Sequence, residues 1–160
     1  RFDNEKEKRY SSGGNVTERI MSIYDETGTF KDPFGYDTFR EGQEAVIDAL
    51  LAGKDVLAVM PTGAGKSICY QVPALMMRGI TLVISPLISL MKDQVRSLNQ
   101  VGISAAYLNS SLTQGQYFTA LRYAKAGRYP IIYVAPERLT TEAFSWIFAL
   151  SADIFHDRSG

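Results

Sequence analysis

The chain has 160 residues but only one cysteine, Cys69, and one histidine, His156. A single cysteine excludes an intrachain disulfide, and no CxxC pair or Cys/His cluster offers ligands for a structural metal ion. No apolar run approaches the roughly 18 residues that a membrane-spanning helix needs. Net charge is also lacking, because 17 Lys and Arg side chains offset 17 Asp and Glu. These absences favour an intracellular protein in a reducing compartment, and the total charge gives no sign of nucleic-acid binding.

The length fits one domain that can bury a core without disulfides. Residues 1–14 are charged, lack periodicity and end in a glycine pair, so they predict a flexible arm or linker. A short helix is expected from Asn15, which has Glu18 three residues on as in a capping box. A second helix is expected over residues 41–52, where apolar residues recur at helical spacing before Gly53.

Beyond residue 54 the pattern changes to short apolar runs that alternate with longer amphipathic stretches. Strands followed by helices of ten or more residues imply right-handed crossovers and a parallel sheet covered on both faces. The sequence therefore predicts a doubly wound α/β fold, with Pro73 expected to kink the first crossover helix or end its first part near Val72. The expected strands are 55–60, 81–85, 104–108 and 129–134, and the expected helices are 66–77, 87–100 and 113–126.

The stretch MPTGAGKS (60–67) lies between the first expected strand and the first crossover helix. Backbone N–H groups in such a turn converge in front of a helix N-terminus, where an anion is favoured. Lys66 would then reach the β and γ phosphates of a nucleotide, and the Ser67 hydroxyl would complete a Mg²⁺ shell. The competing interpretation is a glycine-rich turn with a solvated lysine. The proposed nucleotide-binding set is Pro61, Thr62, Gly63, Ala64, Gly65, Lys66 and Ser67.

Upstream, FGYDTFREGQ (34–43) places aromatic, arginine and glutamine side chains just ahead of the second helix. An adenine base needs a flat apolar or cationic surface, which Tyr36 or Arg40 could supply. It also needs an amide that donates and accepts, as Gln43 can. Without the glycine-rich loop, these aromatic residues would be interpreted as ordinary packing residues.

Four segments in this order resemble the first motifs of the RecQ family of superfamily 2 DNA helicases. They are FGYDTFREGQ, DVLAVMPTGAGKSICYQVPAL, LVISPLISLMKDQ and YVAPERL, and the resemblance runs over residues 34–154, leaving 155–160 as a non-matching tail. It implies an incomplete RecA-like, P-loop NTPase domain over residues 15–154. It also implies ATP-driven 3′-to-5′ unwinding of DNA in repair and recombination. The family loop commonly lacks the leading glycine that Met60 replaces.

The resemblance also implies roles for individual residues. Tyr36, Arg40 and Gln43 match the family's adenine contacts, and Lys66 and Ser67 match its phosphate and Mg²⁺ contacts. Two further loops match segments that lie along DNA, a single strand or a duplex junction, in the family. From the residues alone, Lys92 and Arg138 fit solvated surface positions equally well. The implied DNA-facing residues are Ser85, Pro86, Leu87, Ser89 and Lys92, followed by Pro136, Glu137 and Arg138.

Hydrolysis of ATP needs a carboxylate that holds Mg²⁺ and positions water, and the family supplies it in an Asp-Glu-x-His motif. The sequence contains no such motif. We therefore expect this chain to bind nucleotide weakly without hydrolysing it, although its parent would be a helicase. Two alternatives stay open: a non-catalytic ATP- or DNA-binding module, and a P-loop kinase of small metabolites.

Overall fold

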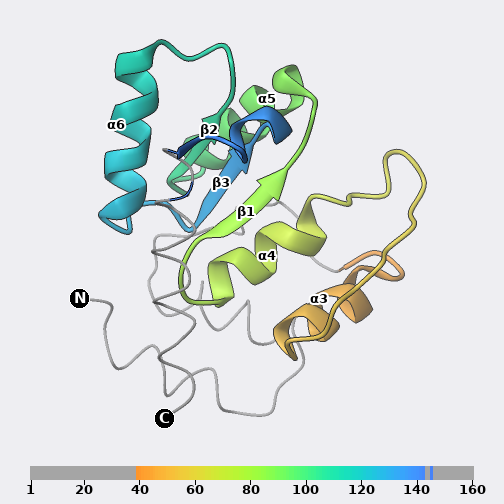
Figure 1. Cartoon of the computed structure of the whole chain (residues 1–160). Coiled ribbons are helices and arrows are strands. Elements are labelled where there is room, and N and C mark those ends of the chain that lie inside the picture. Colours follow the sequence, from red (N-terminus) through yellow and green to blue (C-terminus); the bar gives the residue numbers. More distant parts are fainter. Residues whose placement is uncertain (1–38, 143–144, 146–160) are drawn as a thin grey trace. The chain divides into compact units, whose positions relative to one another are not determined.

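The computed structural model describes residues 39–142 and 145, shown as coloured ribbon in Figure 1. The expected arm, the helix from Asn15, Tyr36 and the tail 155–160 lie outside the described residues. The chain divides into two units at Pro73, and each is described by itself below. Among the described residues, no helix combines the length and apolarity required to span a lipid bilayer.

The first unit contains helix α3, Gln43–Leu51, and most of helix α4, Ile68–Met76. Gly42 precedes α3 with a φ of 83°, in the left-handed region that suits glycine. Ile47, in the middle of α3, is fully buried. Helix α4 continues past Val72 to Met76 with Pro73 inside it, so the expected end near Val72 is wrong. Proline lacks a backbone N–H, and the remaining bonds of the helix tolerate that loss here.

The strand expected over residues 55–60 does not form. The side chains of Leu57 and Val59 are 93% and 90% exposed, and these residues run as an extended loop between α3 and α4. A strand needs a neighbouring strand to satisfy its backbone N–H and C=O groups. Within the described residues no strand pairs with this segment. The apolar composition of residues 55–60 led to the prediction of a buried strand. Composition alone does not show whether a neighbouring strand is available for pairing.

The described part of the second unit contains a parallel sheet of three strands (Figure 1), which are β1 (Thr81–Ile84), β2 (Ala105–Leu108) and β3 (Ile131–Val134). The strand order is β1-β3-β2, and β3 is buried along its whole length. Helix α5, Ile88–Gln100, connects β1 to β2, and helix α6, Gln114–Lys125, connects β2 to β3. Strands and helices in this part agree with the predicted elements to within two residues.

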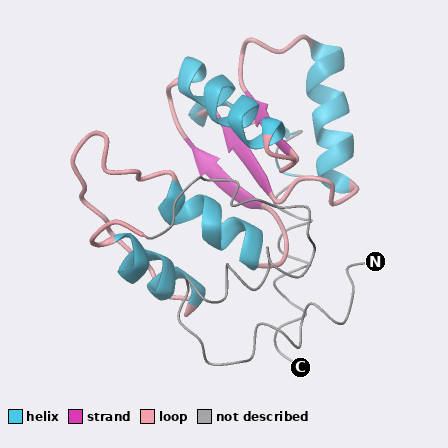
Figure 2. Cartoon of the chain, turned by 180° about the vertical axis from the view of Figure 1, so that it is seen from behind, coloured by secondary structure: helices cyan, strands magenta, loops and turns pink. Residues whose placement is uncertain are grey.

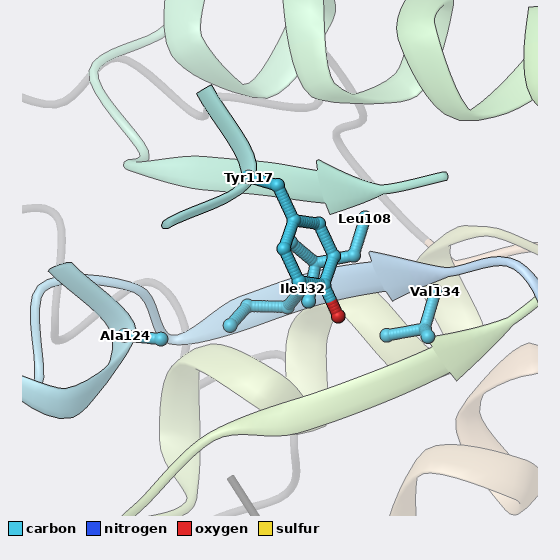
Figure 3. Close-up of a cluster of buried hydrophobic side chains, with 5 residues drawn as sticks. All are labelled: Leu108, Tyr117, Ala124, Ile132 and Val134. Carbon is cyan, nitrogen blue, oxygen red and sulfur yellow. The ribbon is translucent and has the colours of Figure 1, made fainter. Parts of the chain in front are cut away.

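Helices α5 and α6 cover opposite faces of this sheet, as Figures 1 and 2 show from the two sides. The connection through α5 moves two strand positions across the sheet, from β1 to β2. The connection through α6 then moves one position back, from β2 to β3. Because both connections are right-handed and run in opposite directions, the two helices lie on opposite faces. On the α6 face, Tyr117 and Ala124 pack against Leu108, Ile132 and Val134 (Figure 3). The predicted doubly wound α/β arrangement is therefore confirmed for these strands.

A reciprocal capping box begins helix α6, as the sequence predicts. The Thr113 hydroxyl accepts from the Gln116 amide at 3.2 Å, and the Gln116 side chain accepts from the Thr113 amide at 3.0 Å. Two backbone donors that the helix itself cannot satisfy thus gain acceptors.

Replacing Thr113 with alanine should lower the free energy of unfolding by about 1 kcal/mol, the usual contribution of an N-cap side chain. The measurement is urea-induced unfolding followed by circular dichroism. Thr119→Ala is the matched control, because Thr119 is exposed within the same helix and has no capping role. An equal effect of the two substitutions would show that the cap contributes nothing.

Candidate nucleotide and nucleic-acid sites

The glycine-rich loop turns sharply before helix α4. Gly63 and Gly65 have φ angles of 81° and 74°, a backbone region that residues with a Cβ adopt at a cost. The Ala64 amide donates to the Pro61 carbonyl at 3.2 Å, which closes the turn. The Ile68 amide then donates to the Gly65 carbonyl at 3.2 Å at the start of α4. Both glycines are thus required by the shape of the loop.

Several donors of this loop remain available to a ligand. Lys66 is exposed, and neither its ammonium group nor the Ser67 hydroxyl has a partner among the described residues. Backbone amides near a helix N-terminus attract anions through their N–H groups and the helix dipole. The loop therefore offers the donor set that a phosphate group requires. Within the described part of the chain, five of its amides donate no hydrogen bond: those of Thr62, Gly63, Gly65, Lys66 and Ser67.

The two described residues of the predicted adenine site contact the loop itself. Arg40 Nη1 donates to the Gly63 carbonyl at 2.6 Å. Gln43 Nε2 donates to the carbonyls of Ala64 at 3.1 Å and Gly65 at 3.0 Å, while Gln43 Oε1 accepts from the Arg40 amide at 2.7 Å. Gln43 is 3% exposed, and both ends of its carboxamide bind the protein. In this structure both side chains therefore hold the shape of the loop.

The carbonyl groups of residues 63–65 thus point toward Arg40 and Gln43. The N–H groups of the loop that donate no hydrogen bond remain available to a ligand. Sequence reasoning grouped Arg40 and Gln43 with the glycine-rich loop, and the structure brings both side chains to that loop. Their contact to adenine stays a prediction. The sequence reasoning missed the bonds of both side chains to the loop carbonyls, because those bonds depend on how helix α3 faces the loop. No feature of the sequence pattern separates an amide that binds a base from one that binds a backbone.

Cys69, in the first turn of helix α4, lies behind the loop. Its side chain is 6% exposed, and its thiol contacts the Met60 sulfur at 3.9 Å. Burial raises the pKa of this thiol, with a smaller opposing effect from a backbone hydrogen bond. Burial and a raised pKa both favour the protonated thiol, so Cys69 is a packing residue of helix α4.

In the second unit, three loops meet at one edge of the sheet. Parallel pairing aligns Ile84, Val134 and Leu108 at the carboxyl ends of β1, β3 and β2. The loops that follow are residues 85–87, the 3₁₀ helix Pro136–Arg138, and residues 109–112. Open α/β sheets place their ligands at this edge. The two loops with predicted DNA contacts are thus adjacent, as the parallel topology requires.

Most of the predicted DNA-facing side chains are exposed at these loops. The Ser85 hydroxyl accepts from the Leu87 amide at 3.3 Å, which shapes the entry to helix α5. Leu87 is 57% exposed at the start of that helix, an unusual position for a large apolar side chain. Six of the eight predicted residues are exposed: Pro86, Leu87, Ser89, Lys92, Pro136 and Glu137.

The Arg138 side chain is half-buried and contacts the protein, whereas its sequence context was equally compatible with a fully solvated side chain. Its guanidinium carbon lies 5.1 Å from the centre of the Tyr117 ring, a cation–π distance. Arg138 Nη2 donates to the Asn109 carbonyl at 3.3 Å. The side chain thereby ties the loop after β3 to helix α6 and to the loop after β2. A contact to DNA at Arg138 would add to this structural role.

Asn109 is a residue that the sequence reasoning did not single out. It is fully buried, and its Oδ1 accepts from the Ser111 amide at 2.9 Å and the Ser111 hydroxyl at 2.7 Å. Its Nδ2 contacts the Met91 sulfur of helix α5 at 3.6 Å. An Asn-Ser-Ser turn directly after an apolar run was the available signal, but such turns are common in loops of every kind.

A glycine-rich loop with free amides before a helix, in a chain whose second unit contains a doubly wound parallel sheet, is typical of P-loop proteins. Within that class, residues 40–152 match the DEAD/DEAH box helicase family, and the chain belongs to that family. Its resemblance to the RecQ branch is confirmed by the relatives described next.

Three curated relatives illustrate the similarity. The ATP-dependent DNA helicase RecQ of Haemophilus influenzae is 51% identical over 125 residues, or 78% of this chain and 20% of the relative. The protein of the same name in Bacillus subtilis is 52% identical over 112 residues, or 69% and 19%. The ATP-dependent DNA helicase Q-like 5 of Arabidopsis thaliana is 44% identical over 147 residues, or 92% and 15%. The chain thus spans no more than 20% of the length of these relatives.

The close contact between Gly65 and Gln43 leads to a stability prediction. A Cβ at Gly65 would lie 2.5 Å from Gln43 Nε2, whereas a Cβ at Gly63 would meet nothing within 4 Å. Both positions have positive φ, so Gly63→Ala should cost about 1–2 kcal/mol through backbone strain alone. Gly65→Ala should cost more, because the clash adds to the strain. Urea unfolding of the two variants measures the difference.

The same pair of substitutions in a Gln43→Ala background provides the control. Removing the carboxamide relieves the clash but leaves the backbone strain, so the two glycine variants should become nearly equal in stability. If Gly65→Ala stays more destabilising than Gly63→Ala without Gln43, the contact between this side chain and the loop does not explain the difference.

Proposed function

We propose that this chain is the nucleotide-binding part of an ATP-dependent DNA helicase of the RecQ type. The observation that carries the proposal is the loop at residues 61–67, whose free amides surround Lys66 and whose carbonyls are held away by Arg40 and Gln43. RecQ relatives about half identical over most of the chain support the choice of nucleotide and substrate. DNA as the substrate implies a setting inside the cell.

The donors of the loop suit ATP with Mg²⁺. Lys66 would bind the β and γ phosphates, and the free amides of the loop would bind their remaining oxygens. The Ser67 hydroxyl would serve as a ligand to Mg²⁺, which prefers oxygen donors. The bound metal would offset charge on the phosphates. Tyr36, Arg40 and Gln43 would contact adenine, and Gln43 would have to exchange a bond to the loop in order to do so.

The DNA strand would lie along the carboxyl edge of the sheet in the second unit. The amides at the start of α5 and the adjacent Ser85 and Ser89 hydroxyls can hold backbone phosphates, a contact that positions a strand without reading its sequence. Lys92 adds a positive charge one turn further on. Pro136 and Glu137 shape the neighbouring loop, which Arg138 anchors. Coupling of hydrolysis to 3′-to-5′ movement would belong to the whole parent protein.

A non-catalytic role for the chain alone is the second candidate. The specific observation in its favour is the absence of an Asp-Glu-x-His sequence anywhere in the 160 residues. A kinase of small metabolites loses its support, because residues 40–152 match a helicase family.

Calorimetric titration with Mg²⁺-ATP tests the loop. Lys66→Ala should weaken binding roughly 10- to 100-fold, because a hydrogen bond to a charged group contributes about 1.5–3 kcal/mol. Lys54→Ala is the matched control, since Lys54 is exposed outside the loop. Equal affinities of the unmodified chain and Lys66→Ala would argue against the phosphate site.

The second test measures phosphate release from ATP by the chain, with and without single-stranded DNA. We expect no turnover above the level of Lys66→Ala, because the chain lacks a carboxylate motif that positions the attacking water. Turnover that DNA stimulates and that Lys66→Ala abolishes would show that another residue, absent from this proposal, supplies the carboxylate.

A further inference from the structure

A shallow groove of about 560 Å³ lies between helix α5 and strand β2, and we call it the α5–β2 groove. It lies within the second unit and extends beyond the residues that match helicase motifs. Its lining combines positive charge, amide groups and one aromatic ring. The lining residues are Lys92, Val95, Arg96, Asn99, Gln100 and Tyr107.

The positive charge of the groove follows one stripe of α5. Lys92, Arg96 and Gln100 are spaced four residues apart, so they lie above one another on the same helix face. All three are exposed, and neither Lys92 nor Arg96 forms an ion pair within the described residues. On the adjoining face, Met91 and Val95 are buried and fix the helix against the sheet. The two cations are therefore held about one turn apart on a rigid support.

No carboxylate lines the groove among the residues that the structure describes. Residues 94–136 contain no Asp or Glu, whereas they contain Arg96, Arg122, Lys125 and Arg128. The nearest acid in sequence, Asp93, does not line the groove. It follows Lys92 directly and precedes Arg96 by three residues, a neighbouring position on the helix, but within the described residues it forms an ion pair with neither cation. Nothing in the groove lining offsets Lys92 and Arg96, which makes the groove complementary to a polyanion.

The opposite wall of the groove is firm and partly aromatic. The Asn99 side chain binds both backbone groups of Ala105, accepting from its amide at 2.9 Å and donating to its carbonyl at 3.3 Å. This pair of bonds attaches the end of α5 to the start of β2. Tyr107 follows on the same strand, half-buried, and β2 is an edge of the sheet. Basic grooves with an aromatic wall are typical of proteins that bind single-stranded nucleic acid.

From this arrangement we propose that the α5–β2 groove holds single-stranded DNA, with successive backbone phosphates at Lys92 and Arg96 and a sugar or base against Tyr107. The inference rests on the proposed function, because Lys92 belongs to the segment that begins at the loop 85–87. The groove extends that contact along α5, so Arg96, Gln100 and Tyr107 become additional DNA-binding residues. The strand would thus leave the carboxyl edge of the sheet by following α5.

Fluorescence anisotropy with a labelled dT12 strand at several salt concentrations tests this extension on the whole chain. Arg96→Gln should weaken binding about fivefold and should reduce the slope of log affinity against log salt by about 0.7, the amount expected per lost phosphate contact on a single strand. Lys54→Gln is the charge-matched control and should change neither quantity beyond a small non-specific effect. Arg96 is exposed, so the fold should be retained, which circular dichroism checks.

Tyr107 provides an independent second measurement. Tyr107→Phe should bind dT12 like the unmodified chain, because the ring is kept, whereas Tyr107→Leu should bind several-fold more weakly. A duplex of equal length and a poly-glutamate peptide are the competing ligands. The proposal expects both to bind more weakly than dT12 and to depend less on Arg96.

The outcomes separate this inference from the proposed function. If the chain fails to bind dT12 at all, DNA binding by this chain, and the groove with it, is rejected. If dT12 binds and Lys92→Gln weakens it, but Arg96→Gln behaves like Lys54→Gln, only the groove is rejected. Equal binding of poly-glutamate, or tighter binding of the duplex with the same dependence on Arg96, would also overturn the assignment to a single strand.

Discussion

Parallel pairing of β1, β3 and β2 is the constraint on which the second unit depends. Because the register aligns Ile84, Val134 and Leu108, the three strands end together and their loops emerge side by side. Segments separated by some 25 residues in sequence thereby become neighbours along one edge. The backbone continues the alignment past the strands, since the Ser85 amide donates to Val134 at 3.1 Å and the Ala135 amide to Leu108 at 2.9 Å. The candidate DNA surface is a consequence of this pairing.

In the first unit, the main feature is a loop five of whose backbone amides donate no hydrogen bond within the described residues. A loop with unsatisfied N–H groups also has carbonyl groups that compete for any nearby donor or ligand. Here Arg40 and Gln43 bind three of those carbonyls, at Gly63, Ala64 and Gly65. The loop is thus shaped before a ligand arrives, and less ordering remains to oppose binding. Glycine is also required at position 65 because the Gln43 side chain occupies the space that a Cβ would fill.

Much of the fold could be predicted from local signals. Apolar runs of four to six residues bounded by glycine predicted three strands, and the Thr113–Gln116 pair predicted the start of α6. The segment 55–60 shows the limit of this reasoning. It has the composition of the other strands, yet Leu57 and Val59 are almost fully exposed. Pairing is a relation between distant segments, so the sequence of one segment cannot specify its partner.

The same distinction applies to charged side chains at the candidate sites. Lys92 and Arg138 both occur in segments that match helicase motifs, and their sequence contexts predict the same exposed position for both side chains. Lys92 is exposed on α5 and forms no ion pair within the described residues, whereas Arg138 lies over Tyr117 and binds the Asn109 carbonyl. Asn109 in turn is fixed by Ser111 and contacts Met91 of α5. Since these bonds connect the loops after β2 and β3 to both flanking helices, Arg138 makes this edge of the sheet rigid. On the proposed DNA surface, Arg138 would act through that rigidity, and the exposed cations of α5 would supply the attraction for phosphate.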